Sequence, residues 1–176
     1  RHGILYADAV TTVSPTYARE IRTPEGGYGL DADLRARRDS LSGILNGVDY
    51  DDWNPAIDRY LPFHYDANDL TGKLRNKEAL LDLLRMSAAA SVPLIGMVTR
   101  LTRQKGIDLL PEVLPKLLQE RDVRFVALGS GEAQYERFMH ELQQQFPGRV
   151  VFYSGYSEEL AHFIEAAADI FLMPSL

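Results

Sequence analysis

From residue 93 onwards the sequence alternates short apolar runs with amphipathic segments, and this alternation restricts the fold more than any other feature. The apolar runs cover residues 93–99, 123–128, 150–153 and 170–173. Each has the length of a buried strand. Between them apolar residues recur at helical spacing, as Leu110, Leu114 and Leu117 do. Strands that alternate with helices form a parallel sheet with right-handed crossovers. We therefore expect an α/β fold with a parallel sheet, which binds ligands beyond the carboxyl ends of its strands.

Two local signals refine the expected helices. Ser157, followed by Glu158 and Glu159, predicts a helix that the serine caps, with carboxylates in its first turn. Pro115 falls inside the helix expected after the first apolar run. Because proline cannot donate a helical hydrogen bond, it predicts that this helix is kinked or split.

The chain before about residue 47 is less regular. Residues 9–14 are typical of a strand, and Ser14 followed by Pro15 predicts the start of a short helix. Asn46 and Gly47 predict a turn, after which residues 47–68 are irregular and rich in Asp, Pro and Tyr. We therefore expect two domains, residues 1–45 and 46–176, the second of which opens with an irregular crossover.

Charge and composition exclude several classes of partner. The chain has 19 Lys and Arg against 25 Asp and Glu, a formal net charge of −6. It therefore lacks the basic excess of a nucleic-acid binder or of a protein held on an anionic membrane. No apolar run approaches the roughly 20 residues of a membrane span. There is no cysteine, and no two of the four histidines have ligand spacing on one helix face, so we expect neither a metal site nor a cofactor.

The expected end of the first strand carries a cluster of cations. Arg100, Arg103 and Lys105 stand where that strand ends and a helix begins. Arginine can fork onto phosphate oxygens, and lysine adds a mobile charge. In an acidic chain such a cluster suits a diphosphate. The alternative is a solvated basic loop, and spacing alone favours that alternative.

Two glycine-containing segments follow the next two strands. Gly129 and Gly131 flank a serine at the end of the second strand, where glycine permits close approach of a ligand. A tight strand-to-helix turn explains them equally well. Gly155 and Tyr156 follow the third strand. The tyrosine could stack on a base, although packing is the commoner role of an aromatic residue at a strand end.

Six segments, taken in order, carry a family resemblance. They are AVTTVSPTYAREI (9–21), LNGVD (45–49) shortly before WNP (53–55), TRLT (99–102) running on to QKG (104–106), LGSG (128–131), GY (155–156), and AD (168–169) with MPS (173–175). Together they resemble bacterial glycogen synthase and plastid starch synthase. The resemblance implies a retaining glucosyltransferase of the GT-B type, with two Rossmann-like domains across a cleft. This chain would be the middle of such a protein, truncated at both ends.

The resemblance also implies substrates and site residues. The donor would be ADP-glucose and the acceptor an α-1,4-glucan, in the bacterial cytoplasm or a plastid. Arg100 and Lys105 match the family's catalytic basic pair on the donor diphosphate. The matching substrate-binding residues are Tyr156 with Gly155 at the adenine, Gly129 and Gly131 along the donor cleft, and Asn46 near the crossover.

Departures from the family pattern leave alternatives open. Thr99 stands where the family often has serine, which is a mild change. In the family an essential glutamate follows the stretch that matches residues 173–175, so we expect these 176 residues alone to be inactive. A GT-B enzyme that uses a UDP-sugar, and a nucleotide-binding module without catalysis, are the two alternatives.

The remaining candidates favour structural roles. Trp53, Tyr60 and Tyr65 could form a sugar platform, but we expect them to pin the irregular crossover to its domain. His162 is expected at the surface or in the core rather than at a cleft. The acidic residues between 49 and 69 lack calcium-loop spacing, which favours solvated turns.

Overall fold

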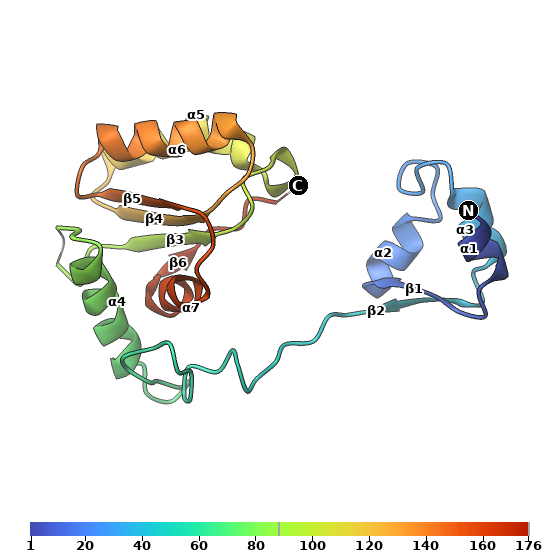
Figure 1. Cartoon of the computed structure of the whole chain (residues 1–176), viewed down its shortest axis with the longest axis horizontal. Helices are drawn as coiled ribbons and strands as arrows, with labels where there is room; N and C mark the ends of the chain where they lie inside the picture. Colours follow the sequence, from blue (N-terminus) through green and yellow to red (C-terminus); the bar gives the residue numbers. More distant parts are fainter. Residues whose placement is uncertain (88, 176) are drawn as a thin grey trace. The chain divides into compact units, whose positions relative to one another are not determined.

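The computed structural model describes residues 1–87 and 89–175. The chain forms two compact units, Arg1–Asp49 and Tyr50–Leu176, and each contains its own sheet (Figure 1).

The first unit is built around two parallel strands. Its elements are α1 (His2–Tyr6), β1 (Val10–Val13), α2 (Pro15–Glu20), α3 (Asp31–Ala36) and β2 (Leu41–Ile44). β1 pairs with β2 in parallel. Ser14 caps α2 as expected, because its hydroxyl accepts the backbone N–H of Tyr17 at 3.2 Å.

The second unit contains the expected parallel sheet. Its strands are β3 (Leu94–Val98), β4 (Arg124–Gly129), β5 (Val150–Ser154) and β6 (Ile170–Phe171), in the order β5-β4-β3-β6. Every pairing between them is parallel. All the carboxyl ends of these strands therefore lie at one edge of the sheet, which is where the candidate site residues were expected.

Helices cover both faces of this sheet. α5 (Leu110–Glu120) and α6 (Ala133–Gln145) lie on one face, and α4 (Thr71–Leu83) and α7 (Glu158–Ala167) on the other (Figure 1). Alternate residues of β4 join different cores: Phe125 packs with α5 and α6, whereas Val126 packs with α4 and α7. Gly96 in β3 lets α7 approach closely, since a Cβ there would lie 2.7 Å from Ile164.

The helix is not split at Pro115, so that part of the prediction is wrong. Two short 3₁₀ turns, η1 (Arg103–Lys105) and η2 (Ile107–Leu109), precede α5, which then runs as one helix from Leu110 to Glu120 with Pro115 inside it. Leu114 and Leu118 are buried against the sheet. Burial of this apolar stripe outweighs the one helical hydrogen bond that proline removes.

A buried lysine ties α4 to the start of the sheet. The Lys77 ammonium, 4% exposed, donates to Asp169 Oδ2 and to the carbonyl oxygen of Ala90, both at 2.6 Å. The same carboxylate oxygen accepts the backbone N–H of Leu94 at 2.7 Å. One ion pair thus joins α4 to β3 and to the residue that precedes β6.

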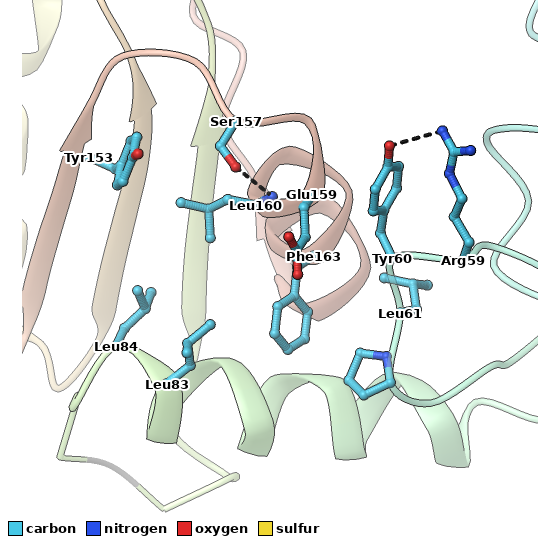
Figure 2. Close-up of a pocket in the computed structure, with 11 residues that line it drawn as sticks. Arg59, Tyr60, Leu61, Leu83, Leu84, Tyr153, Ser157, Glu159, Leu160 and Phe163 are labelled. Carbon is cyan, nitrogen blue, oxygen red and sulfur yellow. Dashed lines mark hydrogen bonds between the residues drawn. The ribbon is translucent and has the colours of Figure 1, made fainter.

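Replacing Ser157 by alanine is expected to lower the free energy of unfolding by about 1 kcal/mol, because the Ser157 hydroxyl accepts the backbone N–H of Leu160 at 3.2 Å and caps α7 (Figure 2). Urea denaturation measures this change. Ser157→Asp, which keeps an acceptor at the same position, is the control and should lose less. Equal stability of the alanine variant and the parent would contradict the capping role.

Candidate functional site

The loops after β3, β4 and β5 are joined by backbone hydrogen bonds. The N–H of Leu101 donates to the carbonyl of Ser130 at 2.9 Å, and the N–H of Gly155 donates to that of Gly129 at 3.1 Å. An isolated parallel bridge also pairs Leu101 with Gly131. The three segments that sequence reasoning singled out therefore form one continuous surface at the carboxyl edge of the sheet.

Arg100 and Lys105 place cationic side chains on this surface. Arg100 is exposed and Lys105 is partly exposed. Within residues 1–87 and 89–175, neither side chain forms an ion pair or a hydrogen bond. Arg103 differs from both, since its Nε lies 3.6 Å from Asp108 and its backbone N–H donates to Glu132 at 3.3 Å. Arg100 and Lys105 thus keep their charge available for an anionic ligand.

Glycine is required for structural reasons at the last residue of β4 and in the loop that follows it. A Cβ on Gly129 would lie 1.9 Å from the carbonyl oxygen of Thr99, and one on Gly131 would lie 2.2 Å from that of Leu101. Any side chain at either position would push the β3 and β4 loops apart. The tight-turn interpretation is therefore sufficient to explain both glycines, and their contact with a donor stays a prediction.

Gly106 brings a further segment to the same edge. Its φ is +68°, and a Cβ there would lie 2.1 Å from the carbonyl oxygen of Pro174. The loop that carries Lys105 thus packs directly on the chain that follows β6. Only glycine satisfies both the backbone conformation and this close approach.

Gly155 and Tyr156 present an aromatic ring to solvent. Gly155 has a φ of +136°, a conformation that side chains rarely adopt. Tyr156 follows it and is 81% exposed. An exposed ring of this kind contributes little to packing, so the packing alternative does not account for it. Stacking on a base stays a prediction.

Sequence reasoning missed Glu136, which holds this edge together. Its Oε1 accepts the backbone N–H of Gly131 at 2.8 Å, and its Oε2 accepts the hydroxyl of Ser154 at 3.3 Å. One carboxylate of α6 therefore joins the loop after β4 to the end of β5. The only signal in the sequence is an acidic residue in the first turn of a helix, which is too common to indicate this role.

Asn46, the remaining predicted site residue, belongs to the first unit. It is exposed and follows β2. Its contact with substrate stays a prediction.

The aromatic residues of the crossover have the structural role expected of them. Trp53 stacks on His162 with ring centroids 3.7 Å apart, and the Tyr60 ring is tilted toward His162 at 4.9 Å. The hydroxyl of Tyr65 donates to the carbonyl of Ala166 at 3.4 Å. These contacts pin the crossover to α7. They also confirm a core position for His162, which is 2% exposed.

A cavity of about 640 Å³ lies between α4, α7, β5 and residues 59–62 (Figure 2). Leu83, Leu84 and Phe163 give it an apolar wall, and Arg59, Ser157 and Glu159 add polar groups. It includes none of the predicted site residues. The diphosphate interpretation therefore depends on the exposed loops at the sheet edge rather than on this cavity.

Comparison with known proteins supports the expected resemblance. The family described as the starch synthase catalytic domain matches residues 1–36, and the family described as glycosyl transferases group 1 matches residues 92–176. Glycogen synthase of Cellvibrio japonicus is 52% identical over 174 residues, and that of Anaeromyxobacter dehalogenans is 55% identical over 173 residues. These alignments cover 99% and 98% of this chain, but only 36% of either relative.

Two solved structures extend the comparison to the fold. The catalytic domain of starch synthase IV from Arabidopsis thaliana, bound to ADP and acarbose, aligns with a TM-score of 0.91 at 44% identity. The alignment covers 98% of this chain and 36% of that one. A glycosyltransferase from Rickettsia africae aligns with a TM-score of 0.63 at 20% identity, covering 97% of this chain and 39% of that one, and shares the fold.

The fold of the chain is that of the GT-B glycosyltransferases. Within that class, the chain is a homologue of the glycogen and starch synthases along its whole length and spans about a third of theirs. The resemblance inferred from its motifs is confirmed. Among the described residues, no helix has both the length and the apolar character that crossing a membrane requires.

Proposed function

We propose that this chain supplies the nucleotide-sugar side of an enzyme that transfers glucose from ADP-glucose to the non-reducing end of an α-1,4-glucan, with retention of configuration. The observation that carries the proposal is the pair of uncommitted cations, Arg100 and Lys105, beside the glycine loops at the carboxyl edge of the sheet. The ADP and acarbose bound by the similar starch synthase IV support a nucleotide and a glucan as ligands. The reaction would take place in the bacterial cytoplasm or in a plastid.

The proposed role of Arg100 and Lys105 follows from the charge that develops on the donor during glucosyl transfer. When the bond between glucose and the diphosphate breaks, negative charge accumulates on the diphosphate oxygens. Fixed positive charge at that position stabilises the transition state more than the ground state. Arg100 and Lys105 lie on loops anchored to the sheet by Leu101 and by the close approach of Gly106 to Pro174. The backbone that carries these charges is therefore fixed before the substrate binds.

A donor assay tests the proposal. The protein is incubated with a glucan primer and radiolabelled ADP-glucose or UDP-glucose, and label in the polymer is counted. We expect incorporation from ADP-glucose. Incorporation from UDP-glucose alone would favour the alternative UDP-sugar enzyme. If the full-length protein binds nucleotide but incorporates no label, a binding module without catalysis is favoured. Because residues 1–176 span 36% of their relatives, we expect this part alone to bind ADP without turnover.

Tyr156→Ala is expected to weaken ADP binding by about 1–3 kcal/mol, the contribution of one base stack on an exposed aromatic ring. Isothermal titration calorimetry with ADP measures the change. Tyr6→Ala removes an equally exposed tyrosine (82%) from the first unit and serves as the matched control with unchanged affinity. An unaltered ADP affinity in Tyr156→Ala would exclude the stacking role.

A further inference from the structure

The buried side chain of His162 has one ring nitrogen without a hydrogen-bond partner among the described residues. The side chain is fully buried, and its Nδ1 lies 2.7 Å from Asp58 Oδ2. Its Nε2 is also buried, and in the part of the chain that the structure describes it has no hydrogen-bond partner. Buried polar atoms are normally satisfied. An unpartnered imidazole nitrogen at a fixed position therefore indicates a group that the protein chain itself does not provide.

Two carboxylates lie beside this histidine. One ligand atom each from Asp52, Glu158 and His162 lies within 4.8 Å of the others. Glu158 stands one helical turn before His162 on α7, and Asp52 comes from the crossover. Asp52 is partly exposed and Glu158 is exposed. The cluster thus joins a fixed buried nitrogen to two carboxylates at the surface.

The Asp58 carboxylate lies at hydrogen-bond distance from Nδ1 of the His162 imidazole. When Nδ1 carries the proton, it donates to Asp58, and Nε2 then presents a lone pair. A carboxylate on the far nitrogen of a histidine is the usual partner behind a metal-binding imidazole, because it orients the ring and raises its basicity. One nitrogen and two carboxylate oxygens suit zinc and similar transition-metal ions.

We propose that His162, Asp52 and Glu158 bind a divalent transition-metal ion of the Zn²⁺ type, with Asp58 as the partner that orients His162. Tetrahedral ligands at bonds of about 2.1 Å lie about 3.4 Å apart. The side chains of Asp52 and Glu158 must therefore close in slightly on the ion, which their exposure permits. A water molecule would complete the coordination, and the ion would tie the crossover to α7.

Arg59 is the competing cation at this cluster. Its guanidinium donates to the hydroxyl of Tyr60 at 2.9 Å (Figure 2). That hydrogen bond and, to a smaller extent, the charges of Asp52 and Glu158 raise the pKa of Arg59. Because Arg59 is exposed, it can turn away to solvent when an ion binds. Arg59→Gln is therefore expected to bind Zn²⁺ more tightly than the parent chain.

The sequence predicts no metal site, because no two of its four histidines have ligand spacing on one helix face. The only local pattern is Glu158 four residues before His162, and the third ligand lies more than a hundred positions earlier in the chain. This spacing alone does not predict a metal site, because the third ligand approaches only when the crossover packs on α7.

Titration of the chain with Zn²⁺ and Co²⁺ tests the site. Calorimetry is expected to show one Zn²⁺ per chain, and the visible absorption of bound Co²⁺ reports its coordination number and geometry. Glu158→Gln should lower the Zn²⁺ affinity at least tenfold, and Asp58→Asn by roughly 10–100-fold, as loss of an orienting partner does. Glu159→Gln makes the same charge change on the neighbouring residue and should leave the affinity unchanged.

Two results would overturn the site. One is the absence of stoichiometric Zn²⁺ binding to the parent chain. The other is an equal affinity in Glu158→Gln and Glu159→Gln, which would show nonspecific binding to surface carboxylates. Because Glu158 is exposed, its variant remains informative even if His162→Gln fails to fold. These readouts require no glucosyl transfer, so they are independent of the proposed function.

Discussion

Replacing Arg100 or Lys105 by alanine is expected to lower glucosyl turnover by roughly two or more orders of magnitude, the scale of losing one preorganised charge contact in a transition state. Both cations stand on the loop after β3 without an ion pair to a described residue. Their loss removes charge from the leaving diphosphate without breaking an ion pair or a side-chain hydrogen bond to a described residue. Stability should therefore change little while kcat falls.

Steady-state kinetics of the full-length protein with ADP-glucose provides the measurement. Arg103→Ala is the matched control, because the Arg103 side chain forms an ion pair with Asp108 and its backbone N–H donates to Glu132. We expect a much smaller fall in kcat for this variant. Normal turnover in Arg100→Ala and Lys105→Ala, with a normal fold, would remove both residues from the phosphate site.

Lys77→Met is expected to lower the free energy of unfolding by about 3 kcal/mol, the low end of the cost of breaking a buried ion pair. The lysine is buried, whereas the carboxylate of Asp169 is 41% exposed and stays partly solvated when its partner is lost. The substitution also leaves the carbonyl of Ala90 without its donor. Because Asp169 also holds the start of β3, the loss should loosen the sheet at its amino edge.

Urea denaturation of the variant measures this cost. Lys73→Met is the matched control on the same helix. Lys73 donates to the carbonyl of Ala166 at 2.8 Å, and burial lowers its pKa. It forms no ion pair with a described residue, so its loss should cost about 1 kcal/mol. A Lys77→Met variant no less stable than Lys73→Met would contradict the importance of the buried pair.

The candidate site shows where sequence reasoning succeeds. The cations at 100 and 105, the glycines at 129 and 131, and Tyr156 were each placed at the end of a strand by the apolar runs before them. Parallel strands bring their carboxyl ends to one edge. Their assembly into one surface therefore follows from the sheet, and the hydrogen bonds between Leu101, Ser130, Gly129 and Gly155 confirm it.

Other features depended on contacts that no local pattern indicates. Glu136 of α6 accepts hydrogen bonds from the loop after β4 and from the end of β5, although an acidic first turn is common in helices. Lys77 forms an ion pair with Asp169, which lies 92 residues later in the sequence. Pro115 shows the opposite case. Its local preference predicted a kinked or split helix, but α5 continues through Pro115 and buries Leu114 and Leu118 against the sheet.

The sequence by itself determined the parallel α/β sheet, the edge that carries the predicted site and the resemblance to glycogen and starch synthases. These depend on hydrophobic periodicity and on motif order, both of which are local properties of the chain. Only the tertiary structure decided which described cations have no ion pair and why glycine is required at the end of β4. It also showed that ligand atoms of Asp52, Glu158 and His162 lie within 4.8 Å of one another. These depend on side chains from distant segments, whose distances are set by how the crossover and helices pack on the sheet.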